Sequence, residues 1–252
     1  MTYLILYTII FIFGIFIGSF LNVCIYRLPN EESIVINASH CLKCGTKIKR
    51  YDLIPIFSWI FLGGKCRSCK DKIPFRYPLV EFINGCLWVC AFLVLGFSAE
   101  AIIVSLLFSA LVVVFFMDLD TQLINTGVVV AIGLLGVAKM IFARNIPISN
   151  HLLGAAVVSL PLLLIHVLTK GQGMGLGDVY LMIAGGLFLG MKSVTVAIFI
   201  GLVLGSIVGM ILKHVTKSSK FAFGPYLSVG IAVSALYGEQ IFNAYLRLVG
   251  LA

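Results

Sequence analysis

The hydrophobic pattern of this 252-residue chain alternates long, almost uniformly apolar runs with shorter polar connections. Eight runs cover residues 3–21, 79–97, 101–117, 128–142, 152–168, 179–191, 194–212 and 226–248. An α-helix needs about 20 apolar residues to cross the hydrocarbon core of a bilayer. The run 179–191 is short for a full crossing, so it must tilt, re-enter or extend through the glycines before it. The pattern therefore predicts an all-α polytopic membrane protein with about eight transmembrane helices, with seven as the alternative.

Composition and charge restrict the class further. Hydrophobic residues make up 61% of the chain and charged residues 11%, which is more apolar surface than a soluble domain of this size can bury. The net charge of +8 does not indicate nucleic-acid binding, because more than half of the 18 lysines and arginines lie between Arg27 and Arg76. A basic connection of this kind is typical of the cytoplasmic side of a membrane protein.

The same charges predict an orientation. No basic residue precedes the run 3–21, so we expect an uncleaved first helix in the cytoplasmic membrane, with the N-terminus outside. With eight crossings, four basic or acid-bearing connections then face the cytoplasm: 25–78, 118–126, 170–177 and 213–225. We expect three parts in the chain: a first transmembrane helix (1–24), a cytoplasmic domain (25–78) and a membrane-embedded core (79–252).

Four cysteines in the cytoplasmic domain form two Cys-x-x-Cys pairs, Cys41 with Cys44 and Cys66 with Cys69. In a reducing compartment this spacing indicates metal rather than disulfides. Four thiolates complete a tetrahedral Zn²⁺ site and leave no position for water, so we expect a structural zinc that supplies folding energy to a domain with few apolar residues. The alternative is two reduced pairs without metal, or a redox dithiol.

Acidic residues in two apolar settings are the candidate chemistry. Asp118 and Asp120 follow the run that ends at residue 117, and Asp178 follows the alternating glycines of Gly173-Met174-Gly175-Leu176-Gly177. A charged side chain at membrane depth costs about 2.5–3.5 kcal/mol on insertion scales, so it usually has a function. The glycines allow positive φ and a close approach to another chain. The expected topology puts Asp118 and Asp178 at the same membrane face.

Two carboxylates that meet at the edge of a low-dielectric phase cannot both ionise easily, so they share a proton. This is the apparatus of an aspartic protease, in which one carboxylate activates water and its protonated partner donates to the peptide carbonyl. Acid pairs in membrane helices also serve proton relays and transporters. Spacing alone leaves peptidase and proton-coupled transporter open, together with a membrane-anchored zinc module that assembles a partner complex.

Several strings, in this order along nearly the whole chain, resemble the bacterial type IV prepilin peptidases, members of the Gly-x-Gly-Asp intramembrane aspartic proteases. The strings are Gly18-Ser19-Phe20-Leu21-Asn22-Val23, Asp52-Leu53-Ile54-Pro55, Gly64-Lys65-Cys66-Arg67, Arg76-Tyr77-Pro78-Leu79-Val80-Glu81, Asp118-Leu119-Asp120 and Gly175-Leu176-Gly177-Asp178. The chain departs from the family at Asn125-Thr126, where Pro followed by Asp or Asn is usual, and at Leu42, where Pro is common.

The resemblance implies a bifunctional enzyme. It would cleave the leader of type IV prepilins or pseudopilins at the cytoplasmic membrane face, and then methylate the new N-terminus with S-adenosylmethionine. Matched by residue, Asp118 and Asp178 would be catalytic, with Asp120, Gly175 and Gly177 in support. Glu81 and Asn84 are candidates for methyl-donor binding, for which helix capping and helix-to-helix hydrogen bonding are the alternative. A peptidase without methyltransferase activity remains a further alternative. The expected partners are prepilin substrates and the lipid bilayer, without nucleic acid.

Overall fold

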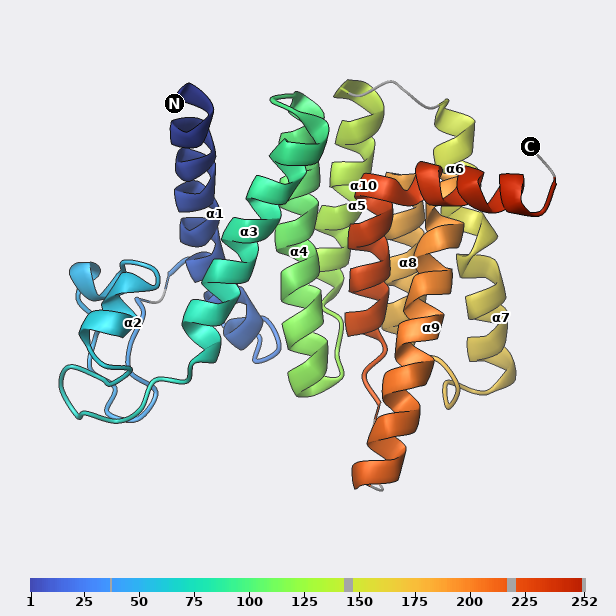
Figure 1. The fold of residues 1–252 in the computed structure, drawn as a ribbon. Coiled ribbons are helices and arrows are strands. Elements are labelled where there is room, and N and C mark those ends of the chain that lie inside the picture. The colour runs from blue at the N-terminus through green and yellow to red at the C-terminus, as the bar shows by residue number, and fades with distance from the viewer. Residues whose placement is uncertain (37, 143–146, 217–220, 251–252) are drawn as a thin grey trace. The chain divides into compact units, whose positions relative to one another are not determined.

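The chain folds mainly into helices, with one long, largely irregular segment between α1 (Thr2–Arg27) and α3 (Arg76–Leu95) that contains α2 (Phe57–Phe61) (Figure 1). The computed structural model describes residues 1–36, 38–142, 147–216 and 221–250. Two compact units divide the chain, Met1–Gly96 and Phe97–Ala252. Unit 1 contains α1 (Thr2–Arg27), the 3-10 helix η1 (Arg50–Leu53), α2 (Phe57–Phe61) and α3 (Arg76–Leu95). Unit 2 contains α4 (Ala99–Thr121), α5 (Thr126–Phe142), α6 (Ile148–Val157), α7 (Ser159–Leu168), α8 (Leu176–Leu189), α9 (Met191–Thr216) and α10 (Gly224–Leu248).

Among the described residues, five helical segments are by length and composition able to cross a membrane, as expected of a multi-pass membrane protein. They are α1, α3, α4, the pair α6–α7 and α9 up to Val215. The helices α5 and α8 are apolar but shorter. Each of the eight predicted runs is largely helical, with the run 152–168 divided between α6 and α7, so the all-α prediction is confirmed. A count of eight crossings stays a prediction, as do the three-part division at residues 24 and 78 and the cytoplasmic orientation. The basic residues Arg144, Lys217 and Lys220 lie outside the described residues.

The last predicted run does not behave as a simple apolar span. Its helix, α10, carries Glu239, Gln240, Asn243 and Arg247 in its second half. Figure 1 shows this last part of α10, in red, running across the other helices of unit 2. A hydropathy pattern gives the composition of a helix but not the direction of its axis, so it could not predict the bend in α10.

Unit 1 is held together by close packing of α1 on α3. A Cβ placed on Gly18 would lie 2.7 Å from the Glu81 Cα, so only glycine permits this approach. At the same interface Asn84 Nδ2 donates to the Gly14 carbonyl at 2.7 Å, and Asn22 Nδ2 donates to the Tyr77 carbonyl at 3.1 Å. Small residues with interhelical hydrogen bonds are typical of helix pairs in membranes.

Unit 2 is built around α8, which packs against α5, α6, α7, α9 and α10. Most of its side chains are buried. Its glycines admit neighbouring backbone, since a Cβ on Gly186 would collide with the carbonyl of Gly154. The run 152–168 is divided between α6 and α7 because Pro161 has no N–H for the carbonyl of Val157, the residue at which α6 ends.

Candidate active site and metal cluster

Asp118 lies in the last turn of α4 and is only 5% exposed. The backbone N–H of Gly224, the first residue of α10, donates to Asp118 Oδ2 at 2.9 Å. An unpaired N–H at a helix N-terminus is well suited to a carboxylate. A Cβ on Gly224 would lie 2.8 Å from the same oxygen, so the bond depends on glycine. The sequence analysis missed Gly224, although a Gly-Pro pair that opens a helix is a recognisable signal.

Asp178 lies in the first turn of α8 and is 8% exposed. Its carboxylate accepts a hydrogen bond from the backbone N–H of Gly175, the N-cap residue of the helix. A side chain at this position that reaches back to the N-cap N–H is half of a capping box. The local sequence therefore fixes the Asp178 carboxylate at the helix entrance.

Ile124, in the connection between α4 and α5, lies beside two glycines, of which Gly224 contacts Asp118 and Gly177 directly precedes Asp178. A Cβ on Gly224 would lie 3.2 Å from Ile124 Cδ1, and a Cβ on Gly177 would lie 3.0 Å from Ile124 Cβ. The Asp118 carboxylate also acts electrostatically on Asp178. Figure 1 shows the end of α4, the connection from α7 to α8 and the start of α10 at one end of unit 2. The fold thus brings together two buried acids that are distant in sequence.

The glycines before Asp178 act differently from the expectation. Gly173, Gly175 and Gly177 do not have positive φ; in this connection positive φ occurs at Lys170 and Gly171. Instead they leave room for side chains, since a Cβ on Gly175 would lie 3.1 Å from Asp178 Oδ2. The expected positive φ is wrong at these three glycines, whereas their close approach to another chain stays a prediction.

Asp120 is exposed on a different face of α4 from the buried Asp118. The family departure at Asn125 has a local explanation, because its Oδ1 accepts from the Gly127 N–H at 2.8 Å at the start of α5. An asparagine that accepts from a backbone N–H two residues on is an ordinary turn and cap residue. The turn therefore keeps a capping group without proline.

Two side chains at the end of α7 hold the connection that leads to Asp178. His166 Nδ1 donates to the Met174 carbonyl at 2.8 Å, and the Gly173 N–H donates to Thr169 Oγ1 at 3.1 Å. The imidazole must carry its proton on Nδ1, because a carbonyl oxygen can only accept. We predicted no role for His166 from the sequence. Its partner is the backbone carbonyl of Met174, and the spacing of residue types along the chain does not indicate a bond of this kind.

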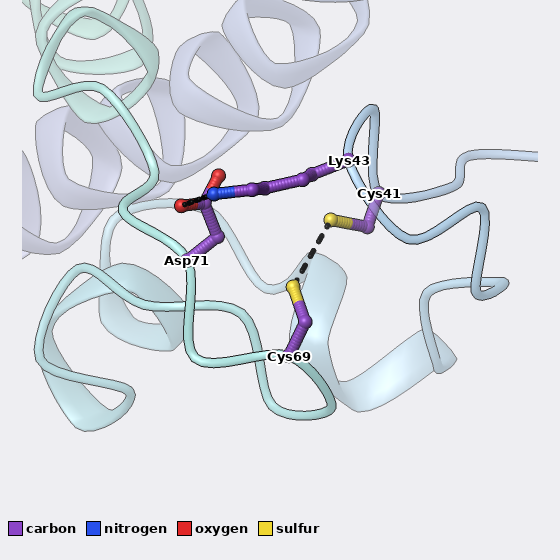
Figure 2. A network of polar contacts seen from close by, with 4 residues as sticks. All are labelled: Cys41, Lys43, Cys69 and Asp71. Carbon is purple, nitrogen blue, oxygen red and sulfur yellow. Dashed lines mark hydrogen bonds and ion pairs between the residues drawn. The ribbon is translucent and has the colours of Figure 1, made fainter.

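The four cysteines form one cluster in the insert, the segment between α1 and α3. Their Sγ atoms all lie within 4.8 Å of one another. Cys41 Sγ and Cys69 Sγ are 3.8 Å apart (Figure 2), which is too far for a disulfide. It matches the edge of about 3.8 Å that a tetrahedron with Zn–S bonds of about 2.3 Å would have. The cluster can hold a metal ion, as the Cys-x-x-Cys spacing predicted.

The two halves of the cluster are similar tight turns. Each is closed by a single bridge, His40 with Lys47 in the first and Lys65 with Lys72 in the second. The residue after each pair has positive φ, 68° at Gly45 and 59° at Lys70. Figure 2 shows Lys43 of the first turn reaching Asp71 beside the second, at 2.8 Å.

Hydrogen bonding lowers the thiol pKa at two ligands of the cluster, Cys44 and Cys66. Hydrogen bonds from the side chain and backbone of Thr46 lower the pKa of the Cys44 thiol to about 6. The Cys44 Sγ and Thr46 Oγ1 atoms are 3.3 Å apart. A metal binds the thiolate and not the thiol, so this contact prepares Cys44 as a ligand.

Glu81 and Asn84 are both buried in α3. Asn84 Nδ2 donates to the Gly14 carbonyl of α1. This is the helix-to-helix hydrogen bonding that was the alternative to methyl-donor binding for this residue. Glu81 Oε2 accepts from the backbone N–H of Ile56 at 2.7 Å. The carboxylate therefore fixes the insert backbone close to the start of α3.

Comparison with known proteins identifies the relatives of this chain. Residues 12–95 match the family described as Bacterial Peptidase A24 N-terminal domain, and residues 105–210 match the Type IV leader peptidase family. A Bacillus subtilis protein is 32% identical over 96% of this chain and 98% of its own length. A Neisseria gonorrhoeae protein is 32% identical over 92% of this chain and 91% of its own length, and a Pseudomonas aeruginosa protein is 31% identical over 94% and 92%. Each is named prepilin leader peptidase/N-methyltransferase.

The chain belongs to the type IV leader peptidase family. The predicted resemblance is confirmed, and with it the prediction of an enzyme of this family. The leader peptidase match contains Asp118 and Asp178, whereas Gly224 lies beyond its last residue. The match to the N-terminal domain contains the four cysteines. No solved structure matches the chain significantly.

Proposed function

We propose that this protein removes the leader peptide of type IV prepilins or pseudopilins at the cytoplasmic face of the cytoplasmic membrane, and then methylates the new N-terminus. The observation that carries the proposal is the buried pair Asp118 and Asp178 at one end of unit 2. Relatives that share nearly the full length of the chain and carry both activities in their names support it.

The acid pair supplies general acid–base chemistry. One ionised carboxylate takes a proton from water while the water oxygen attacks the carbonyl carbon of the scissile bond. The protonated partner donates to the carbonyl oxygen, and the departing amine takes a proton as the C–N bond breaks. Gly224 and Gly175 hold the carboxylates in place, so the site is organised before substrate enters.

The length of α8 fits proteolysis below the membrane surface. Its 14 residues span about 21 Å, whereas the hydrocarbon core is about 30 Å thick. If its far end lies near the opposite surface, Asp178 is recessed by several ångströms. A prepilin leader junction would then reach the acids in extended form, with its own apolar helix entering between the spans.

Methyl transfer would use S-adenosylmethionine. When bound, it would supply an electrophilic methyl group to the new terminal amine, which would lose a proton to complete the transfer. Zn²⁺ would be structural, because Cys41, Cys44, Cys66 and Cys69 already provide four ligands and leave none for substrate. The orientation with the N-terminus outside remains part of the proposal.

The test is to incubate the purified protein with a prepilin in detergent. We expect leader release at one junction, followed by a gain of one methyl group when S-adenosylmethionine is present. Asp118→Asn and Asp178→Asn should each abolish cleavage. A proton-coupled transporter would show no cleavage with any variant, and a peptidase without methyltransferase activity would cleave without the mass gain.

A further inference from the structure

One buried hydroxyl near the acid pair has no role in the acid–base chemistry proposed above. Ser228 lies in α10, one turn after Gly224, and is 3% exposed. Its Oγ has no hydrogen-bond partner among the residues that the structure describes, and in that part of the chain Ser234 Oγ is the only other buried side-chain atom of this kind. A buried polar group without a partner lowers stability, so its presence needs an explanation.

Helix geometry directs the Ser228 side chain toward the acid pair. Residues four apart on an α-helix lie about 40° apart around its axis, with Cβ atoms about 5–6 Å apart. A Cβ on Gly224 would lie 2.8 Å from Asp118 Oδ2, and helical side chains tilt toward the N-terminus, which for Ser228 is the direction of Gly224. The hydroxyl therefore lies within about 5 Å of the Asp118 carboxylate, the span of one bridging water with two hydrogen bonds.

The helices beside α10 offer this hydroxyl few other polar groups. α10 packs against α4 and α8; α4 ends at the acid pair, and α8 and α10 begin there (Figure 1). Residues 110–117 of α4, which precede Asp118, are all apolar. Among residues 179–185 of α8, which follow Asp178, the one polar side chain is Tyr180, and it is exposed. The polar groups that α4 and α8 present near Ser228 are therefore the two acids.

We propose that Ser228 is a positioning residue for the acid pair, and that its hydroxyl holds one buried water that donates to the Asp118 carboxylate. This inference rests on the proposed function and deepens it. Buried waters typically make about three hydrogen bonds to groups that otherwise lack partners. Asp118 Oδ2 already accepts from the Gly224 N–H, so a second donor fixes the rotation of the carboxylate. The acid is then oriented for proton transfer before substrate binds.

The test compares two substitutions of the same shape that differ in the hydroxyl. Ser228→Thr keeps the hydroxyl and Ser228→Val replaces it with a methyl group, so crowding by the added atoms is common to both. With a prepilin as substrate, we expect kcat of Ser228→Val to be at least about tenfold below that of Ser228→Thr, with KM equal within about twofold. Ser228→Ala, which adds no atom, should lose kcat as Ser228→Val does.

Ser234 provides the matched control. Its hydroxyl is also 3% exposed and without a partner among the described residues. It lies about 80° from Gly224 around the axis of α10 and about 15 Å from it along the axis. Ser234→Ala should therefore keep the kcat of the unaltered protein. Equal kcat in Ser228→Thr and Ser228→Val, or equal losses in Ser228→Ala and Ser234→Ala, would overturn the role of Ser228.

A measurement without substrate separates this inference from the proposed function. A hydroxyl bonded to a buried water stabilises the fold, whereas a buried hydroxyl without a partner is less favourable than a methyl group. The melting temperature of Ser228→Thr in detergent should therefore exceed that of Ser228→Val. A wild-type protein that cleaves no prepilin would contradict the proposed function, and the melting comparison would still decide this inference. A melting temperature of Ser228→Val at or above that of Ser228→Thr would overturn it, even if the protein cleaves prepilins.

Discussion

At the scale of single residues, one backbone N–H joins α10 to the candidate acid pair. Gly224 donates to Asp118 from a position where a Cβ would lie 2.8 Å from the acceptor oxygen. Real side chains do not tolerate that distance, so a substitution must displace either the carboxylate or the start of α10. The position of Asp118 is therefore set by a residue 106 positions away.

We expect Gly224→Ala to lower kcat/KM for prepilin cleavage by roughly 10- to 100-fold, because misplacement of a catalytic group by about 1 Å has effects of that size. The control is Gly133→Ala in α5, where a Cβ meets nothing within 4 Å. That variant should retain full activity. Equal activity in the two variants would show that the Gly224 contact does not position Asp118.

The ion pair between Asp52 and Arg67 makes the stability of the insert depend on pH, since Arg67 Nε and Nη2 donate to the two Asp52 carboxylate oxygens at 2.8 and 2.6 Å. Hydrogen bonding to Arg67 lowers the pKa of Asp52 below its ordinary value of 3.8. A carboxyl with a depressed pKa stabilises the folded state above its ordinary value, and this contribution is lost as the pH falls through the lowered pKa.

Melting temperatures of wild type and Asp52→Asn should therefore differ at pH 7, with the variant less stable, and should converge as the pH falls below about 4. A difference that persists unchanged in acid would mean that the pair is not the cause. The comparison of two variants at each pH removes the contributions of all other titrating groups.

At the scale of elements, α8 is held at both ends by histidines that donate to backbone carbonyls. His166 donates to the Met174 carbonyl just before α8, and His151 donates to the Leu187 carbonyl near its end, each at 2.8 Å. The bonds are alike, but only the first lies beside Asp178. Substitutions at His166 and His151 can therefore distinguish an effect on catalysis from an effect on stability alone.

We expect His166→Leu to lower kcat about tenfold or more, with partial recovery in His166→Asn, because the asparagine amide can donate where Nδ1–H did. His151→Asn is the control and should leave kcat unchanged, whatever it does to the melting temperature. If substitutions at both positions alter only the melting temperature, the connection between α7 and α8 stabilises the fold but does not position Asp178.

We expect the cysteine turns to depend on metal for their fold, because two isolated bridges are their only regular structure among the described residues. Cys66→Ser should lower bound zinc from about one per chain to near zero and increase proteolysis of the insert. Cys86→Ser, in α3, should change neither. Elemental analysis of the purified proteins gives the answer, and full zinc occupancy in Cys66→Ser would contradict a four-thiolate site.

At the scale of the whole molecule, the sequence predicted the elements better than their arrangement. Apolar runs locate every long helix because burial in lipid requires them. The break at Pro161 follows from the missing N–H. The direction of the last part of α10 and the number of crossings do not follow, because hydropathy does not record how a helix lies against its neighbours.

The candidate site shows the same limit. The two acids and the four cysteines are chemically unusual in their surroundings, so they could be found from the sequence. His166 and Ile124 could not, because each acts through a backbone group or a contact with another connection. Gly224 could be recognised as the start of a helix, but not as the donor to Asp118, which is distant in sequence. The glycines near Asp178 do not have the positive φ that we expected from their sequence, and they leave space for neighbouring side chains.

The central claim is that Asp118 and Asp178 act as one catalytic unit, and a double-mutant comparison tests it most directly. Single-turnover cleavage of a prepilin should be measured for Asp118→Asn, Asp178→Asn, the double variant and Asp120→Asn. Because Asp118 and Asp178 must share one proton, we expect either single substitution to remove as much activity as the double one. Asp120→Asn should retain most of the activity. Independent, additive losses at Asp118 and Asp178, or measurable cleavage by either single variant, would contradict it.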